Sequence, residues 1–145
     1  MIRTCSSCGT KNRVPAARLA DSGRCGACKA PLPPASEPID ADEALFDEIV
    51  REARVPVLVD FWAPWCAPCR FTAPEVQELA RQMAGRALVL KVNTEAHPEL
   101  AARYQIQAIP NFIVFRGGQP VSQHAGAVSR TEMQGWLEEA GASTG

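Results

Sequence analysis

The chain has 145 residues, enough for one ordinary domain with a small appendage. Hydrophobic residues make up 46% and charged residues 21%, which is compatible with a globular core, and a net charge of −1 predicts binding of the whole chain to neither nucleic acid nor a membrane. No apolar run approaches the roughly 18 residues of a membrane span. No secretory signal is visible either, so we expect a cytoplasmic protein.

The charge is divided unevenly along the chain. Residues 1–38 carry six Lys and Arg against two Asp and Glu, whereas residues 39–145 carry nine against fourteen. Residues 31–38 read PLPPASEP, which predicts a semi-rigid linker of polyproline type. We therefore expect a small module over 1–30, a proline-rich linker over 31–38 and a second module over 39–145.

The first module contains two Cys-x-x-Cys pairs. Their combined spacing, C-x2-C-x16-C-x2-C, is typical of a structural zinc site with the ligands Cys5, Cys8, Cys25 and Cys28. Some thirty residues with few apolar side chains cannot bury a sufficient core, so one Zn²⁺ would supply the missing folding energy. Small disulfides or idle thiols are the alternatives, and a reducing compartment disfavours the disulfides.

The basic side chains of this module could contact phosphates. The module has no Phe, Tyr or Trp on which a base could stack, however, and a solvated basic face is the simpler interpretation. Nucleic acid is therefore not expected as a partner.

The second module alternates between helical and strand patterns. In chain order we expect a helix over 40–53, a strand over 55–63, a helix over 73–85, a strand over 86–93, a helix over 97–105, two strands over 111–126 and a helix over 129–141. This order predicts an α/β fold, with a mixed central sheet and helices on both faces.

The third Cys-x-x-Cys pair, Cys66 and Cys69, follows a predicted strand and opens a helix. This context favours redox chemistry, because a helix N-terminus stabilises a thiolate and positions three apart on a helix can close a disulfide. We expect Cys66 to be the exposed nucleophile and Cys69 the resolving thiol. Pro68 costs little between them, since N–H groups of the first turn lack intrahelical partners.

Three nearby residues break the local patterns. Asp60 interrupts the apolar run VLVDFW; it is either an edge or loop residue, or a buried acid with a raised pKa that moves protons for a thiol. Pro74 lies inside the helical pattern and should kink that helix. Pro110 precedes a predicted strand, where its X-Pro bond could be cis.

Together, these motifs resemble the thioredoxin family over essentially all of residues 40–141. The resemblance rests on VLVDFWAPWCAPCRFTAPEVQELA, KVNTEAHPELAARYQIQAIPNFIVFRGG and HAGAVSR, and the cysteine-rich front resembles that of zinc-ribbon-bearing bacterial thioredoxins. It implies a thioredoxin fold in which the Ile109–Pro110 bond is cis and faces the cysteine pair. It also implies that Asp60 is the buried acid beneath Cys69, with Lys91 near it.

The resemblance further implies a surface on which substrate docks. That surface would be bordered by Trp65, Ile109, Pro110, Gly126 and Ala127, with Phe61 and Trp62 packed behind it. The dipeptide between the cysteines is Ala67 and Pro68, where thioredoxins typically have Gly-Pro. This dipeptide tunes the redox potential, which we expect near the reducing end of the roughly −270 to −120 mV that related folds span.

The implied function is reduction of disulfides in client proteins. By resemblance, an NADPH-dependent thioredoxin reductase would restore the dithiol, and the chain itself would bind no flavin or nicotinamide. Three other hypotheses stay open: a disulfide-forming oxidase, a partner-binding module that uses the ribbon, and a zinc-linked redox sensor whose ribbon thiolates release the metal on oxidation.

Overall fold

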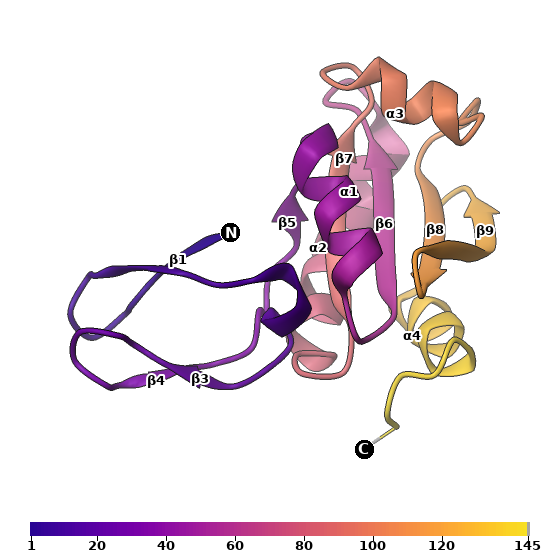
Figure 1. Cartoon of the computed structure of the whole chain (residues 1–145). Helices are drawn as coiled ribbons and strands as arrows, with labels where there is room; N and C mark the ends of the chain where they lie inside the picture. Colours follow the sequence, from indigo (N-terminus) through magenta and orange to yellow (C-terminus); the bar gives the residue numbers. More distant parts are fainter. Residues whose placement is uncertain (145) are drawn as a thin grey trace.

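The computed structural model describes residues 1–144, which form an N-terminal pair of β-hairpins and an α/β domain (Figure 1). In the N-terminal part, β1 (Ile2–Thr4) pairs antiparallel with β2 (Lys11–Arg13), and β3 (Gly23–Arg24) pairs antiparallel with β4 (Pro31–Leu32). A short 3-10 helix, η1 (Ala16–Arg18), lies between the two hairpins. The second hairpin therefore reaches two residues into the segment expected to be a linker.

The α/β domain has one strand more than the sequence pattern indicates. Its elements are β5 (Ile39–Asp40), α1 (Glu43–Glu52), β6 (Val57–Trp62), α2 (Ala67–Gln82), β7 (Leu88–Asn93), α3 (Pro98–Arg103), β8 (Asn111–Arg116), β9 (Gln119–Ala125) and α4 (Arg130–Glu139). The extra strand is β5, whose two residues are too few to show an alternating pattern. Asp40 was expected to begin the first helix, which instead starts after the N-cap Asp42.

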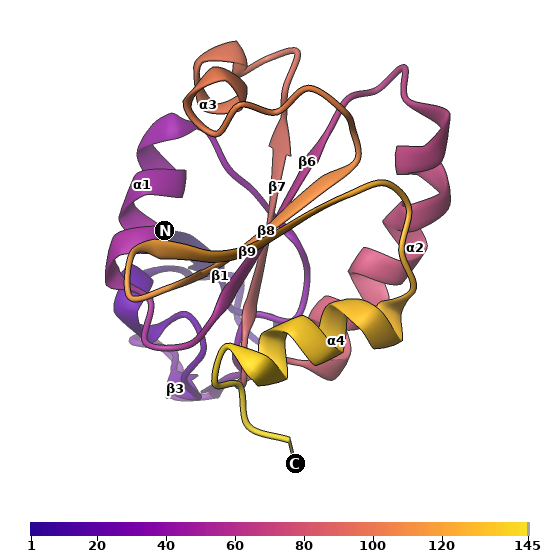
Figure 2. The same ribbon diagram turned by 90° about the vertical axis from the view of Figure 1, so that its right-hand side faces the viewer.

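The five strands of the domain form one mixed sheet in the order β5-β7-β6-β8-β9. β5, β7 and β6 are mutually parallel, whereas β8 is antiparallel to β6 and β9 is antiparallel to β8. Helices α1 and α3 cover one face of the sheet, and α2 and α4 cover the other (Figure 2). The predicted α/β class, with helices on both faces of a mixed sheet, is confirmed.

Successive side chains of the central strand β6 point to opposite faces of the sheet, and so toward different pairs of helices. Val57, Val59 and Phe61 join the apolar cluster beneath α1 and α3, while Leu58 joins the cluster beneath α2 and α4. Asp60 has the same parity as Leu58. Its carboxyl is therefore directed toward α2, the helix that begins at the third cysteine pair.

The N-terminal module packs directly against the domain. Ala16 and Leu19, which are 2% and 0% exposed, belong to the same buried cluster as Phe46 of α1. The Ala35 N–H donates to the carbonyl of Leu19 at 2.9 Å, and Leu32 and Ala35 are buried. The proline-rich segment is thus packed against its neighbours rather than extended freely through solvent.

Helix α2 starts at Ala67 and continues through Pro74. Proline has no N–H, so the Arg70 carbonyl lacks its usual partner one turn later. In the part of the chain that the structure describes, no helix is both long enough and apolar enough to span a bilayer.

Candidate redox and metal sites

Cys66 and Cys69 form a disulfide where β6 gives way to α2. Cys66 is the N-cap residue of α2, and its Sγ accepts a hydrogen bond from the Cys69 N–H at 3.2 Å. The two Cα atoms lie 5.3 Å apart. The Cys69 N–H, which has no partner within the helix, therefore donates to the sulfur of Cys66. This hydrogen bond would stabilise a Cys66 thiolate.

One expectation about this pair is wrong for the oxidised form. Cys66 is not the exposed cysteine, since it is 3% exposed and Cys69 is 5% exposed. Ala63 lies buried with the two cysteines, and Ile109 packs against this small cluster. The exposed side chain next to the pair is that of Trp65, which is 67% exposed.

The segment around Pro110 faces the disulfide. The Ile109–Pro110 peptide bond is cis, and Cys66 Sγ lies 3.7 Å from the Ile109 carbonyl oxygen. The Gly126 N–H donates to the Pro110 carbonyl at 2.8 Å. Gly126 has φ of +95°, a left-handed conformation that suits glycine, so the loop after β9 is held beside the cis proline. Ala127 follows it and is exposed.

Asp60 lines the same cavity as Cys69 and is almost inaccessible, with 2% of its surface exposed. Burial raises the pKa of its carboxyl to about 7, although the ammonium group of Lys91 opposes this effect. Oδ1 has no hydrogen-bond partner among the described residues. A cavity of about 290 Å³ is lined by Asp60, Cys69 and Lys91, among others, and connects the carboxyl with the second thiol. The edge or loop position considered for Asp60 is excluded.

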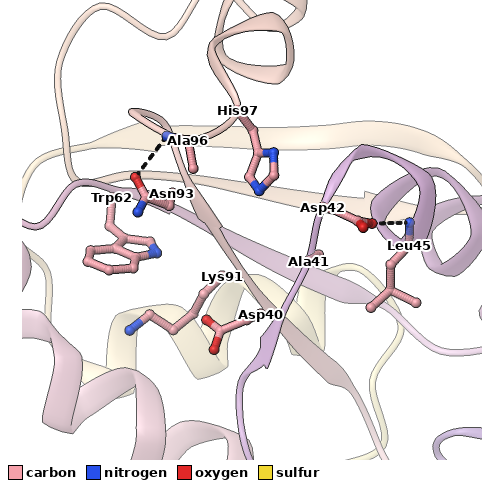
Figure 3. A pocket seen from close by; sticks show the side chains of 9 residues that line it. All are labelled: Asp40, Ala41, Asp42, Leu45, Trp62, Lys91, Asn93, Ala96 and His97. Atoms are coloured by element: carbon pink, nitrogen blue, oxygen red, sulfur yellow. Dashed lines mark hydrogen bonds between the residues drawn. The ribbon is translucent and has the colours of Figure 1, made fainter. Parts of the chain in front are cut away.

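Lys91 separates this cavity from a second one. It pairs with Asp60 across the parallel β6–β7 ladder, and its Nζ lies 4.5 Å from the centroid of the Trp62 ring. On the other side of Lys91 and Trp62 is a surface pocket of about 440 Å³, which also includes Asp40 and His97 (Figure 3). Sequence reasoning missed this pocket, because Asp40 reaches Lys91 only through the unpredicted pairing of β5 with β7.

The other two cysteine pairs meet in the N-terminal hairpins. The four Sγ atoms of Cys5, Cys8, Cys25 and Cys28 all lie within 4.8 Å of one another. Two of the distances are 3.7 Å, between Cys5 and Cys28, and 3.6 Å, between Cys8 and Cys25. Four sulfurs at about 2.3 Å from a tetrahedral Zn²⁺ would be about 3.8 Å apart, so the cluster fits that ion.

The four thiols of the cluster differ in acidity. Backbone hydrogen bonds from Cys28 and Ala27 lower the pKa of the Cys25 thiol to about 6, whereas at Cys28 the lowering by the Ala30 backbone is outweighed by neighbouring thiols and burial, which raise the pKa to about 11. Four thiols this close cannot all lose their protons unless a positive charge compensates them. Asn12 stabilises the cluster from outside, since its amide donates to Cys25 Sγ at 3.6 Å and accepts from the Gly26 N–H at 2.9 Å.

Two family profiles match separate parts of the chain. The profile of the family Thioredoxin matches residues 37–139, and that of Thioredoxin 2, N-terminal, matches residues 4–30. Thioredoxin C-3 of Corynebacterium nephridii is 38% identical over 139 residues, which cover 96% of this chain and 94% of that protein. Thioredoxin 1 of a Nostoc species is 47% identical over 97 residues, which cover 67% of this chain and 91% of that protein.

A solved structure supports the same relationship. A thioredoxin variant from Halobacterium salinarum superposes with a TM-score of 0.69 at 26% sequence identity, covering 77% of this chain and 96% of that one. The two chains thus share a fold. In this chain the fold holds the disulfide, the cis proline and the buried carboxyl of Asp60. The chain therefore belongs to the thioredoxin family, carries the N-terminal zinc-ribbon module of thioredoxin 2, and is a thiol–disulfide oxidoreductase that uses Cys66 and Cys69.

Proposed function

We propose that the protein reduces disulfides of client proteins, with Cys66 as the attacking thiolate, Cys69 as the resolving thiol and Asp60 as the proton acceptor. The observation that carries this assignment is the position of the Cys66–Cys69 disulfide at the N-terminus of α2, where Cys69 shares a cavity with the buried carboxyl of Asp60. Three N-terminal features of α2 favour the Cys66 thiolate over that of Cys69: the capping position, the Cys69 N–H and the helix dipole.

The first step forms a mixed disulfide. The Cys66 thiolate attacks one sulfur of the client disulfide, a bond forms between the two sulfurs, and the second client sulfur leaves as a thiolate that takes a proton from solvent. The exposed ring of Trp65 and the segments at Ile109–Pro110 and Gly126–Ala127 would border the client backbone. The Ile109 carbonyl, 3.7 Å from Cys66 Sγ, supports this placement of the docking surface.

The second step releases the client. Asp60 accepts the proton of Cys69, and the Cys69 thiolate attacks Cys66, which closes the disulfide and expels the remaining client thiolate. Two electrons pass from the pair to the client. A carboxyl with a pKa of about 7 is matched to this transfer near neutral pH, and the cavity of about 290 Å³ has room for water to carry the proton. Lys91 tunes the acid by favouring its ionised form.

The remaining assignments concern the dipeptide, the metal and the partner. Ala67 and Pro68, both exposed in the first turn of α2, would set the potential of the pair. Cys5, Cys8, Cys25 and Cys28 would hold one Zn²⁺ in a closed structural site, with no flavin or nicotinamide in the chain. An NADPH-dependent thioredoxin reductase would regenerate the dithiol. A reducing compartment such as the cytoplasm suits the four ribbon thiolates.

A trapping experiment tests the order of the two cysteines. Cys69→Ser should accumulate a mixed disulfide between Cys66 and a reducible client, because the resolving thiol is absent, whereas Cys66→Ser should trap nothing. The unaltered protein serves as the control, since its Cys69 resolves the mixed disulfide and none should accumulate. Trapping by Cys66→Ser in place of Cys69→Ser would overturn the assignment.

The zinc-linked sensor is a second candidate, and one observation favours it. The hairpins that carry the metal ligands lie on either side of η1, and Ala16 and Leu19 pack into the core beneath α1. Oxidation of the ribbon thiolates would release the metal and loosen these contacts. Loss of one Zn²⁺ per chain with peroxide, at doses that leave the fold of β6 and α2 intact, would support this second role.

A further inference from the structure

Four arginines converge on one cleft of the N-terminal module, away from the redox pair. The cleft has a volume of about 310 Å³ and is lined by residues of both hairpins and of η1. Its arginines come from four different elements: Arg3 from β1, Arg13 from β2, Arg18 from η1 and Arg24 from β3. Neither the thiol chemistry nor the zinc site uses them.

The positive charge of this cleft is not neutralised by the protein. Asp21 is the one carboxylate in its lining, and none of the four guanidinium groups forms an ion pair within residues 1–144. Arg3 donates to the Pro33 carbonyl, and Arg24 donates to the Lys29 carbonyl at 3.4 Å. These neutral acceptors orient the two guanidinium groups without compensating their charge. The cleft thus carries a net charge of about +3, which an anion would relieve.

We infer that the cleft is a binding site for a small molecule that bears a phosphomonoester or diphosphate group. Guanidinium groups recognise phosphate oxygens through paired N–H donors, and a phosphate group offers three terminal oxygens where a carboxylate offers two. Four guanidinium groups offer more N–H donors than the two oxygens of a single carboxylate can accept. The small volume of the cleft, about 310 Å³, suits an isolated phosphate group better than an extended nucleic-acid backbone.

The rest of the lining limits which part of the ligand is recognised. The module has no aromatic side chain, so the base of a nucleotide would find no stacking partner, and recognition rests on the phosphate itself. The buried side chain of Leu32 closes one part of the cleft. Asn12 and Gly26 line the cleft and also support the metal cluster through the Asn12 contact with Cys25. Asn12 and Gly26 therefore link the cleft to the metal cluster.

Isothermal titration of the full-length, zinc-loaded protein with inorganic pyrophosphate, in a buffer free of other multivalent anions, tests this inference. We expect saturable binding of about one pyrophosphate per chain that weakens as salt is added. Arg13→Gln and Arg18→Gln should each weaken it about tenfold, because each removes charge-assisted hydrogen bonds. Lys11→Gln removes an exposed positive charge outside the cleft and should leave the affinity unchanged.

Zinc content and disulfide reduction of each variant distinguish loss of the site from loss of the fold, and both should match those of the unaltered protein. Chemical shift changes on adding pyrophosphate should be confined to the cleft. Absence of saturable binding, or an equal loss in Lys11→Gln, would overturn the inference. So would tighter binding of a short single-stranded oligonucleotide, or of an acidic peptide, than of pyrophosphate.

Discussion

Replacing Asp60 with asparagine tests whether burial of this carboxyl costs stability, as the structure requires. The side chain is 2% exposed, and its pKa rises from 3.8 to about 7 on burial, against the opposing charge of Lys91. The folded state therefore binds this proton more tightly than the unfolded state does. The contribution of Asp60 to the free energy of unfolding is therefore fully present below about pH 4. It is lost as the pH rises from there through about 7. The difference of about 3 pKa units, at 1.36 kcal/mol each, corresponds to a loss of about 4 kcal/mol.

Asparagine is a neutral isostere of the protonated acid and does not incur this loss. Asp60→Asn should match the unaltered protein near pH 4 and should exceed its stability by up to about 4 kcal/mol above pH 8. Between these limits the gain should grow by at most about 1.4 kcal/mol per pH unit. Urea unfolding of the oxidised, zinc-loaded proteins across this range measures the gain directly, while resolution of a mixed disulfide near neutral pH should become slower.

Asp40 provides the matched control for this experiment. It stands in register with the same Lys91, from the opposite neighbouring strand, but its side chain is exposed. An exposed carboxylate near an ammonium group contributes at most about 1 kcal/mol, so Asp40→Asn should change stability little. A gain for Asp60→Asn that does not depend on pH, or an equal gain for Asp40→Asn, would refute the reasoning.

Three further predictions address the neighbouring parts of the structure. Lys91→Met removes the charge that opposes burial, so the pKa of Asp60 should rise above about 7 and the pH profile of client reduction should move upward; an unmoved profile would contradict the pairing. Leu19→Ala should cost about 2–5 kcal/mol in urea unfolding, since the side chain is 0% exposed, whereas Val121→Ala, at 53% exposed, should stay within about 0.5 kcal/mol. Chelation of zinc should speed hydrogen exchange over residues 1–34 while β6 and β8 remain protected; loss of protection throughout would show one cooperative unit.

Local signals in the sequence were sufficient for much of the site. The spacing of four cysteines predicts that they can share a metal, and they do converge within 4.8 Å. A lone carboxyl in an apolar strand allows two interpretations, an edge or loop residue or a buried acid, and Asp60 proves to be buried. The strand-to-helix position of the third pair predicts a disulfide at a helix start, which Cys66 and Cys69 form. Each of these signals lies within a short stretch of chain, and few other local conformations satisfy it.

The remainder depends on contacts between distant segments. The strand order places Asp40 and Asp60 on either side of Lys91, and no pattern within the two residues of β5 could reveal this. The burial of Cys66 depends on Ile109, which lies 43 positions away in the chain. The basic residues of the first module are evident in the sequence, but their convergence on one cleft depends on how two hairpins and η1 pack together.

A redox titration of the Cys66–Cys69 pair, with zinc content determined on the same samples, tests the central claim most directly. The account predicts a two-electron midpoint near −270 mV, the thioredoxin value, and about one Zn²⁺ retained per chain while the pair is oxidised and reduced. Ala67 would then leave the pair a reductant, and the ribbon metal would be independent of the catalytic cycle. A midpoint near −120 mV, or zinc lost in step with oxidation of the pair, would contradict it.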